Sequence, residues 1–315
     1  MQRVVGSAVR FPDYAALMPR LFAVLLLLAL AAPTLAAQDS TDTPTSDTPL
    51  MLWSLADADN TVHLLGSVHF ARADFFPLAA PIEAAYDSAE VVVFEIDLAE
   101  MQAEAMTMVQ RGMFADTTTL ADVVSDSLYA QALAATQAAG LPEPAVAKME
   151  PWMLSLTLTS LDLMQKGYGA GIDQHYFERA VADEKRVQAL ETVAFQLDLF
   201  DTMPMDQQVE FLQVTLDGRD ETEAMMAGMM TAWMDGDAEA LDAFMDENFQ
   251  DAPDLETALL TDRNAAWVPE IEALLDGTDD AFVVVGAGHL VGDDSVVAML
   301  RAAGYTVTRH TATGG

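Results

Sequence analysis

Two short, nearly unbroken apolar runs constrain the fold of this chain more than any other feature of its sequence. They are Val91–Ile96, which reads VVVFEI, and Phe282–Val285, which reads FVVV. A strand with one wet face alternates apolar and polar residues, whereas a strand covered on both faces reads as a continuous apolar run. The sheet must therefore be covered by helices on both faces, which is the arrangement of α/β proteins.

Further strand-like segments lie toward the two ends of the chain. Leu52–Ala56 and Val62–Val68 predict a hairpin around the turn Asp57–Asn60, and Arg186–Leu190 and Tyr305–Arg309 predict two more strands. Helical patterns fill the middle, over Leu98–Phe114, Leu120–Ala139, Glu150–Gln165, Ile172–Glu184, Asp206–Leu216, Glu221–Met234, Ala238–Phe249 and Glu270–Leu275, with Pro269 early in or just before the last.

This order predicts an α/β fold with a central mixed or mostly parallel sheet, built from the N- and C-terminal segments, and a large helical insertion. We expect one domain over residues 51–312, with the insertion in two parts at about 98–184 and 193–280.

The N-terminus has the pattern of an export signal. The apolar run Leu21–Ala32 follows three arginines, and as a helix it reaches only about 18 Å, short of a bilayer core. We therefore expect a signal peptide over 1–36, a disordered polar linker over 37–50, and a periplasmic or extracellular protein. The true start is Met1 or Met18, and the alternative for the run is a buried N-terminal helix. No later stretch predicts a transmembrane segment after signal cleavage.

Charge and cysteine content exclude several functions. The chain has 14 Lys and Arg against 50 Asp and Glu, a net charge of −36, and such a surface cannot displace the counterions of DNA or RNA. It has no cysteine, which excludes thiolate zinc sites and a cysteine nucleophile. A metal would need ligands from His, Asp and Glu.

Two histidines follow strand-like segments in the same sequence pattern. Gly66-Ser-Val-His69 and Gly286-Ala-Gly-His289 each place an imidazole three residues after a glycine, which we expect to release the backbone from the strand conformation. Ligands in open α/β sheets bind beyond the carboxyl ends of the strands, so the two histidines are expected to share a ligand. A single histidine after a strand is more often only a hydrogen-bonded polar residue.

Two glutamates reach the same predicted edge. Glu95 closes the VVVF run, and Glu191 follows the strand at Arg186–Leu190. A carboxylate in an apolar run is costly unless it is paired or bound to metal. Two imidazoles and a carboxylate suit a catalytic divalent metal, and the alternative for Glu95 is a salt bridge to Arg263.

The remaining histidines and the methionines carry weaker signals. His63 is about 20 Å from His69 along an extended strand, and His175 and His310 default to surface or structural roles. Fifteen of the 19 methionines lie between Met101 and Met245. They indicate either gap-filling core, which we favour, or an adaptable groove for apolar or peptide ligands.

From about Leu52 to Arg309 the chain resembles the TraB/GumN family. The resemblance rests on motifs in the family's order: Leu52-Trp53, Leu64–His69, Phe76–Leu78, Ala85, Glu95-Ile-Asp97, Pro151-Trp152, Gly171-Ile-Asp173, Leu190-Glu-Thr192, Gln196, Arg263-Asn264, Trp267 and Val285–Gly292. The family is distantly similar to the Tiki metalloproteases that cleave Wnt proteins, and more remotely to haem-binding ChaN-like and erythromycin-esterase-like proteins. The resemblance implies an α/β fold in which the GxxH histidines and the glutamates are the metal and catalytic residues.

The leading hypothesis is an exported metal-dependent hydrolase, most simply a peptidase acting on a peptide or small-molecule substrate. His69, His289 and Glu95 would bind manganese, cobalt or zinc, and Glu95 or Glu191 would act as general base. Arg263 would stabilise the oxyanion or hold a substrate carboxylate, or else form an ion pair with Glu95 or Asp173. The expected supporting residues are Gly66, Ser67, Asp173, Asn264, Gly286 and Gly288.

Two alternatives stay open. The protein could bind haem, a metal or a peptide without catalysis, or the cluster could serve only as a scaffold for protein contacts.

Overall fold

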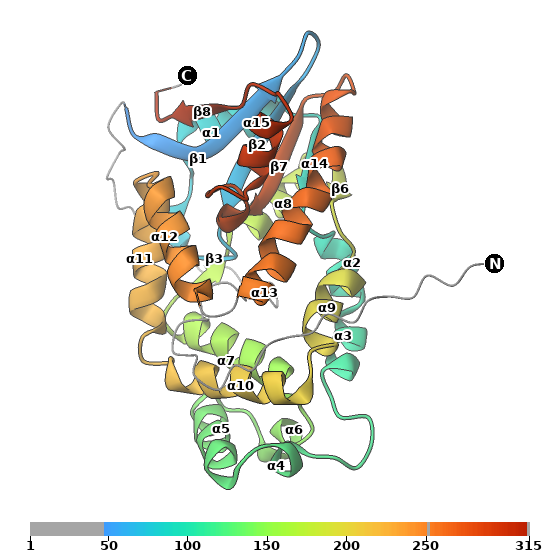
Figure 1. The fold of residues 1–315 in the computed structure, drawn as a ribbon, viewed down its shortest axis with the longest axis vertical. Coiled ribbons are helices and arrows are strands. Elements are labelled where there is room, and N and C mark those ends of the chain that lie inside the picture. Colours follow the sequence, from blue (N-terminus) through green and yellow to red (C-terminus); the bar gives the residue numbers. More distant parts are fainter. Residues whose placement is uncertain (1–46, 251–252, 314–315) are drawn as a thin grey trace, which may run out of the picture.

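The computed structural model describes residues 47–250 and 253–313, and they form an α/β protein around one main sheet (Figure 1). The sheet has six strands in the order β6-β4-β7-β2-β1-β8. These strands are β1 (Pro49–Ala56), β2 (Thr61–Ser67), β4 (Val91–Phe94), β6 (Arg186–Ala189), β7 (Ala281–Gly286) and β8 (Thr308–Thr311). β1 and β8, the first and last strands of the described residues, are neighbours, which confirms the predicted sheet from N- and C-terminal segments.

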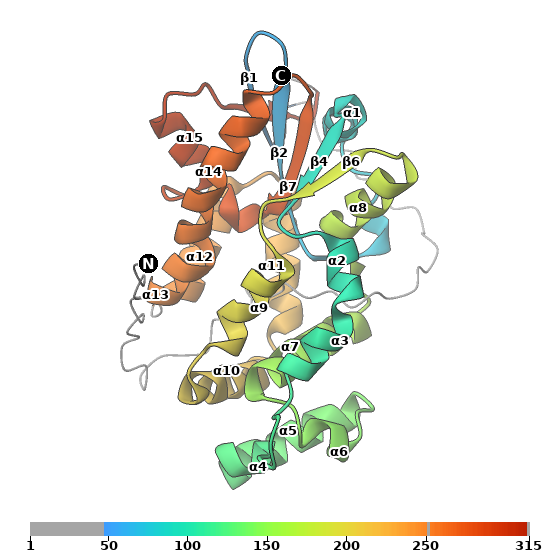
Figure 2. The same cartoon turned by 90° about the vertical axis from the view of Figure 1, so that its right-hand side faces the viewer.

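The sheet is mixed, and its parallel part contains the apolar runs. β6, β4, β7 and β2 are mutually parallel, while β1 pairs antiparallel with β2 and β8. β4 and β7 are buried along almost their whole length. Figure 2 shows helices on both sides of these strands, with α14 (Asp262–Leu275) and α15 (Val296–Ala302) on one and α1 (Ala80–Ser88) and α8 (Ile172–Ala182) on the other. This double cover explains the unbroken apolar runs.

A large helical region lies beyond the carboxyl ends of these strands (Figure 1). It has its own apolar clusters, one around Trp152, Phe200 and Phe249 and one around Leu120, Leu154 and Leu212. The helices are α2 (Leu98–Ala103), α3 (Ala105–Arg111), α4 (Leu120–Val123), α5 (Asp126–Ala138), α6 (Glu143–Val146), α7 (Pro151–Gln165), α9 (Val193–Asp201), α10 (Met205–Asp217), α11 (Thr222–Met234), α12 (Ala238–Phe249) and α13 (Pro253–Glu256).

Short elements join these parts. β3 (Phe70–Ala71) and β5 (Gly169–Ala170) form a two-stranded ribbon, and short 3₁₀ turns cover Ala73–Phe75 (η2) and Ala287–His289 (η4). A π-helical segment, η3 (Thr257–Thr261), leads directly into α14. No helix in the described ranges is long and apolar enough to span a membrane.

Several predicted boundaries were wrong. The strand expected at Tyr305–Arg309 is Thr308–Thr311, and the helix expected over Leu98–Phe114 is divided at Glu104. The helix expected over Leu120–Ala139 is two helices, because Ser125 caps the second by accepting from the Leu128 amide.

No helix was predicted at α1, α6, α9, α13 or α15. Pro269 lies inside α14, which begins seven residues earlier than that proline. β1 starts at Pro49, inside the predicted linker 37–50. The signal peptide expected at 1–36 and the linker up to residue 46 lie outside the described residues.

Candidate functional site

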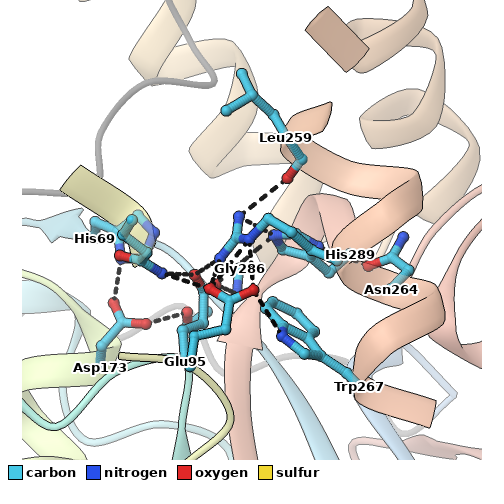
Figure 3. Close-up of polar contacts among 12 residues, drawn as sticks. His69, Glu95, Asp173, Leu259, Asn264, Trp267, Gly286 and His289 are labelled. Atoms are coloured by element: carbon cyan, nitrogen blue, oxygen red, sulfur yellow. Dashed lines mark hydrogen bonds and ion pairs between the residues drawn. The ribbon is translucent and has the colours of Figure 1, made fainter. Parts of the chain in front are cut away.

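The topology brings the four predicted strand-end residues to one place. β6, β4, β7 and β2 are adjacent and parallel, so their carboxyl ends share one edge of the sheet. Glu191, Glu95, His289 and His69 follow these four strands in that order. The close-up in Figure 3 shows the resulting cluster, in which these side chains meet residues of α14 and the start of α8.

The guanidinium of Arg263 lies at the centre of this cluster and uses all five of its N–H groups. Nε and Nη2 donate to Glu191, with contacts of 2.9 Å each, and Nη2 also donates to Glu95 Oε2 at 2.7 Å. Nη1 donates to the Leu259 carbonyl at 3.0 Å and to His289 Nε2 at 3.1 Å. A guanidinium has five N–H donors, so the predicted contact with a substrate oxyanion or carboxylate would require one of these bonds to break.

The ion pairs around Arg263 are buried. The side chains of Arg263, Glu95 and Glu191 are 3%, 6% and 7% exposed. The sequence left open whether Arg263 pairs with Glu95 or Asp173. In the structure Arg263 forms ion pairs with both Glu95 and Glu191.

The two glutamates differ in what they face. Glu191 accepts hydrogen bonds from Arg263, from the Trp267 indole at 2.9 Å and from Gln196 at 3.1 Å. Its carboxylate therefore holds these three side chains in place. Glu95 has Oε2 bound to Arg263 and Gln196, whereas Oε1 accepts from the Gly286 amide at 2.7 Å. Oε1 of Glu95 is therefore directed at the β7 turn that carries His289.

His289 is fixed as a neutral imidazole. Asn264 uses its amide nitrogen to donate to the Asp294 carbonyl, so its Oδ1 must accept from His289 Nδ1 at 2.7 Å. His289 Nε2 then accepts from Arg263. Burial and the Arg263 charge lower the pKa of His289 to about 3.

His69 has a carboxylate behind it. Its Nδ1 donates to Asp173 Oδ2 at 2.9 Å, and the other oxygen of Asp173 accepts from the Ser67 hydroxyl. Burial alone would lower the pKa of His69, but Asp173 and, more weakly, Glu95 raise it to about 9. His69 is therefore protonated near neutral pH, with Nε2–H as its second donor.

Close packing at Gly171 places Asp173 beside His69. A Cβ at Gly171 would lie 2.1 Å from the Val68 carbonyl oxygen and 2.3 Å from the backbone carbonyl carbon of His69. The Ile172 amide donates to that Val68 oxygen at 2.9 Å. The first turn of α8 is thereby fixed against the turn after β2, and Asp173 lies in that first turn.

The glycines of the two GxxH turns act differently from the prediction. Gly66 and Gly286 do not adopt positive φ, and Gly286 has φ −50° and ψ 136°, which other residues also adopt. What they provide is room. A Cβ at Gly66 would lie 3.1 Å from Ala287, and one at Gly286 would lie 3.3 Å from Glu95 Oε1, 3.5 Å from His289 Cδ2 and 3.9 Å from His69 Nε2.

The missing side chain of Gly286 thus leaves a gap bordered by Glu95, His69 and His289. Burial alone would raise the pKa of Glu95, but the charges of Arg263 and His69 and the hydrogen bond from the Gly286 amide hold it well below its usual range, so Glu95 is ionised. Gly286, Glu95, His69 and His289 line one cavity, in which a carboxylate oxygen can accept and an imidazolium Nε2–H can donate a hydrogen bond.

The predicted metal set does not fit around Arg263 as it is placed. Within the described ranges, no group of three or more His, Asp or Glu side chains is arranged to hold a metal ion. Arg263 occupies the region between Glu95, Glu191 and His289, and its charge would repel a divalent cation there. A metal bound by His69, His289 and Glu95 would require Arg263 to move.

Some site residues carried no chemical role in the sequence analysis. Gln196 donates to both glutamates, Trp267 donates to Glu191, and the Leu259 carbonyl accepts from Arg263. Trp267 lies four residues after Arg263 on α14, a helical spacing that could have shown it. His63, by contrast, lies near His310, with ring centroids 5.8 Å apart, and His175 stacks on Phe76.

The fold and the site define an α/β protein with a buried Arg–Glu–His centre at the carboxyl edge of its sheet. Residues 51–309 match the model of the TraB/PrgY/gumN family, and the chain belongs to this family. It is 24% identical over 242 residues to a protein of Escherichia coli (strain K12) named "Uncharacterized protein YbaP", covering 76% of this chain and 87% of YbaP. The YbaP of Shigella flexneri matches equally. No solved structure matches the chain.

Proposed function

We propose that this protein is an exported hydrolase, a peptidase in the simplest case, that uses Glu95 and His69 to transfer protons around a water molecule. The observation that carries the proposal is the gap at Gly286, which Glu95 Oε1, His69 Nε2 and His289 border in one cavity. His69 is protonated and Glu95 is ionised, which are the states that a general acid and a general base need.

The reaction follows from this placement. Glu95 Oε1 accepts a proton from water as the water oxygen attacks the carbonyl carbon of the substrate. Nε2–H of His69 gives its proton to the leaving nitrogen, and the C–N bond breaks to yield a carboxylic acid and an amine. The neutral His69 is a stronger base than Glu95, so it takes the proton back from Glu95 and the site returns to its starting state.

Arg263 has a positioning role in this scheme. It holds Glu95 ionised and fixes its orientation through Oε2, while Glu191 and His289 fix the guanidinium. A divalent metal would supply Lewis acidity to the same chemistry. No step of the proposed reaction uses a metal, because His69, His289 and Glu95 could bind one only after Arg263 moves.

The non-catalytic haem site has less support. The cavity beside His69 and His289 has a volume of about 80 Å³, too small for a haem, and His289 Nε2 is already bonded to Arg263.

The test is a peptide-library cleavage screen on purified protein with parallel metal analysis. We expect E95Q and H69A to lose cleavage by at least about 10²-fold, the typical contribution of general acid–base catalysis. H63A removes a histidine from β2, the strand that precedes His69, away from the site, and should retain activity. The proposal fails if the folded protein cleaves nothing, or if E95Q and H69A remain as active as H63A. Activity that appears only with added manganese, cobalt or zinc would instead support the metal-dependent form.

A second experiment tests the gap itself. In G286A the added methyl group would lie 3.3 Å from Glu95 Oε1 and narrow the space proposed for the water, without a forbidden backbone conformation. The same substitution at Gly228 of α11 places a methyl group with nothing within 4 Å. We expect G286A to lose cleavage while its melting temperature stays close to that of the wild type, and G228A to keep both. Full activity in G286A would contradict the proposed position of the water.

A further inference from the structure

The cavity over the polar centre has an apolar side built from a different part of the chain. We call this side the apolar wall: Met226 and Met229 of α11, Leu241, Phe244 and Met245 of α12, and Leu260 of the π-helical segment. The opposite side holds His69, Glu95, Arg263 and His289. α11 and α12 lie side by side in Figure 1.

The apolar wall is fixed to the site by direct contacts. The Trp233 indole of α11 donates to the Gly66 carbonyl at 2.7 Å, which ties this helix to the first GxxH turn. On the second turn, a Cβ at Gly288 would lie 2.7 Å from Met245 Cε, so this methionine packs on the backbone beside His289. A substrate attacked by water at Gly286 would therefore have its adjacent side chain against the apolar wall.

Charge is kept away from this wall. α12 contains four acidic residues, Glu239, Asp242, Asp246 and Glu247, but within the described residues none of them lines the cavity. In a chain of net charge −36, helix α12 presents Leu241, Phe244 and Met245 to the cavity, at i, i+3 and i+4. A charged group placed there would lose its hydration without gaining a partner on the apolar wall.

Only some of the methionines of the apolar wall are buried in the core. Met226 is 3% exposed and belongs to the main apolar cluster, which agrees with the gap-filling interpretation. Met229 and Met245 are half-buried beside the cavity, and methionine side chains adapt to a ligand at little cost. A cavity of about 80 Å³ with such a boundary suits a small branched or linear aliphatic group.

We infer that the substrate carries an uncharged aliphatic side chain next to the bond that is cleaved, and that the apolar wall binds this side chain. This inference rests on the proposed function for the cleavage itself. It rests on the cavity for the side-chain preference.

The first arm of the test compares peptide amides that differ in one side chain: leucine, valine, glycine, aspartate or lysine. We expect kcat/KM for leucine and valine to exceed that for the others by at least about tenfold, the range that a hydrophobic pocket gives for a few carbon atoms. M245Q and M229Q should reduce this ratio by lowering kcat/KM for the leucine and valine substrates. M234Q is the control, because Met234 is 50% exposed at the end of the same helix α11.

The second arm does not depend on hydrolysis. In protein with ¹³C-labelled methionine methyl groups, N-acetyl-leucinamide should shift the signals of Met229 and Met245 and leave that of Met234 in place. N-acetyl-aspartamide should shift none of them.

The two arms separate the two possible failures. Cleavage with no side-chain preference, or with a preference for charged side chains, overturns the inference and leaves the proposed function. Methionine shifts without any cleavage overturn the proposed function and leave the apolar site. If neither cleavage nor shifts occur, both are overturned.

Discussion

Replacing Arg263 by methionine removes the one cation that is bonded to both site glutamates. Methionine keeps the apolar stem of the arginine but leaves Glu95 and Glu191 buried without their ion pair. At an effective dielectric constant of 20, one such pair is worth about 4 kcal/mol. Removing one partner of a buried pair costs about 3–5 kcal/mol, because the remaining charge stays buried. With two carboxylates stranded, we expect R263M to lose at least about 4 kcal/mol of unfolding free energy at neutral pH.

The assay is urea unfolding followed by tryptophan fluorescence. With an m value of about 3 kcal/mol/M, the transition midpoint should fall by more than 1 M, at about 4 kcal/mol of lost stability. The triple variant R263M/E95Q/E191Q removes the charges together, and because deleting all partners of a buried pair costs far less than deleting one, it should be more stable than R263M. Lowering the pH should also narrow the difference between R263M and the wild type, since the stranded carboxylates become protonated. If R263M loses less than about 1 kcal/mol, or if the triple variant is no more stable than R263M, the buried network does not have the strength inferred from its geometry.

Three further outcomes follow from the contacts around His69 and β2. NMR titration should give His69 a pKa of about 9, and D173N should lower it. Because this pKa is raised from 6.5, the pair with Asp173 stabilises the fold fully below about pH 6.5, and unfolding experiments should show this contribution disappearing as the pH rises through 9. G171A should be strongly destabilised in the same urea assay and should shift the His69 titration, since its methyl group would overlap the Val68 carbonyl; a wild-type midpoint in G171A would contradict this packing.

The sequence was sufficient to place four side chains at one edge of the sheet. The apolar runs at β4 and β7 indicate parallel strands covered on both faces, and residues that follow such strands must meet at the carboxyl edge. The juxtaposition of His69, Glu95, Glu191 and His289 needs no more than this topology. It does not depend on where each strand begins or ends, which is why the errors at Pro49 and Tyr305 had no effect on it.

The partners of these side chains could not be predicted in the same way. Asp173 and Arg263 were both open to several pairings, because a sequence does not show the direction in which a helix approaches the sheet. Asp173 reaches His69 because Gly171 lets α8 pack on the backbone after β2. Arg263 reaches both glutamates because α14 begins at Asp262, after a π-helical segment whose Leu259 carbonyl accepts from the same guanidinium. The helix predicted from the sequence starts near Pro269 and does not contain Arg263. The direction of the Arg263 side chain could therefore not be predicted.

The GxxH glycines show most directly what local sequence leaves out. Local sequence can indicate a need for unusual backbone angles, and that was the basis for interpreting Gly66 and Gly286, yet neither has a positive φ. The restriction at Gly286 comes from Glu95, 191 positions earlier, and from His69, more than 200 positions earlier, which border the volume a side chain would fill. In this site the space left by glycine is itself functional under our proposal, because a methyl group would fill the gap between Glu95 and His69. The same argument requires that enlarging residue 286 abolish cleavage while Arg263, Glu191 and His289 keep their hydrogen bonds.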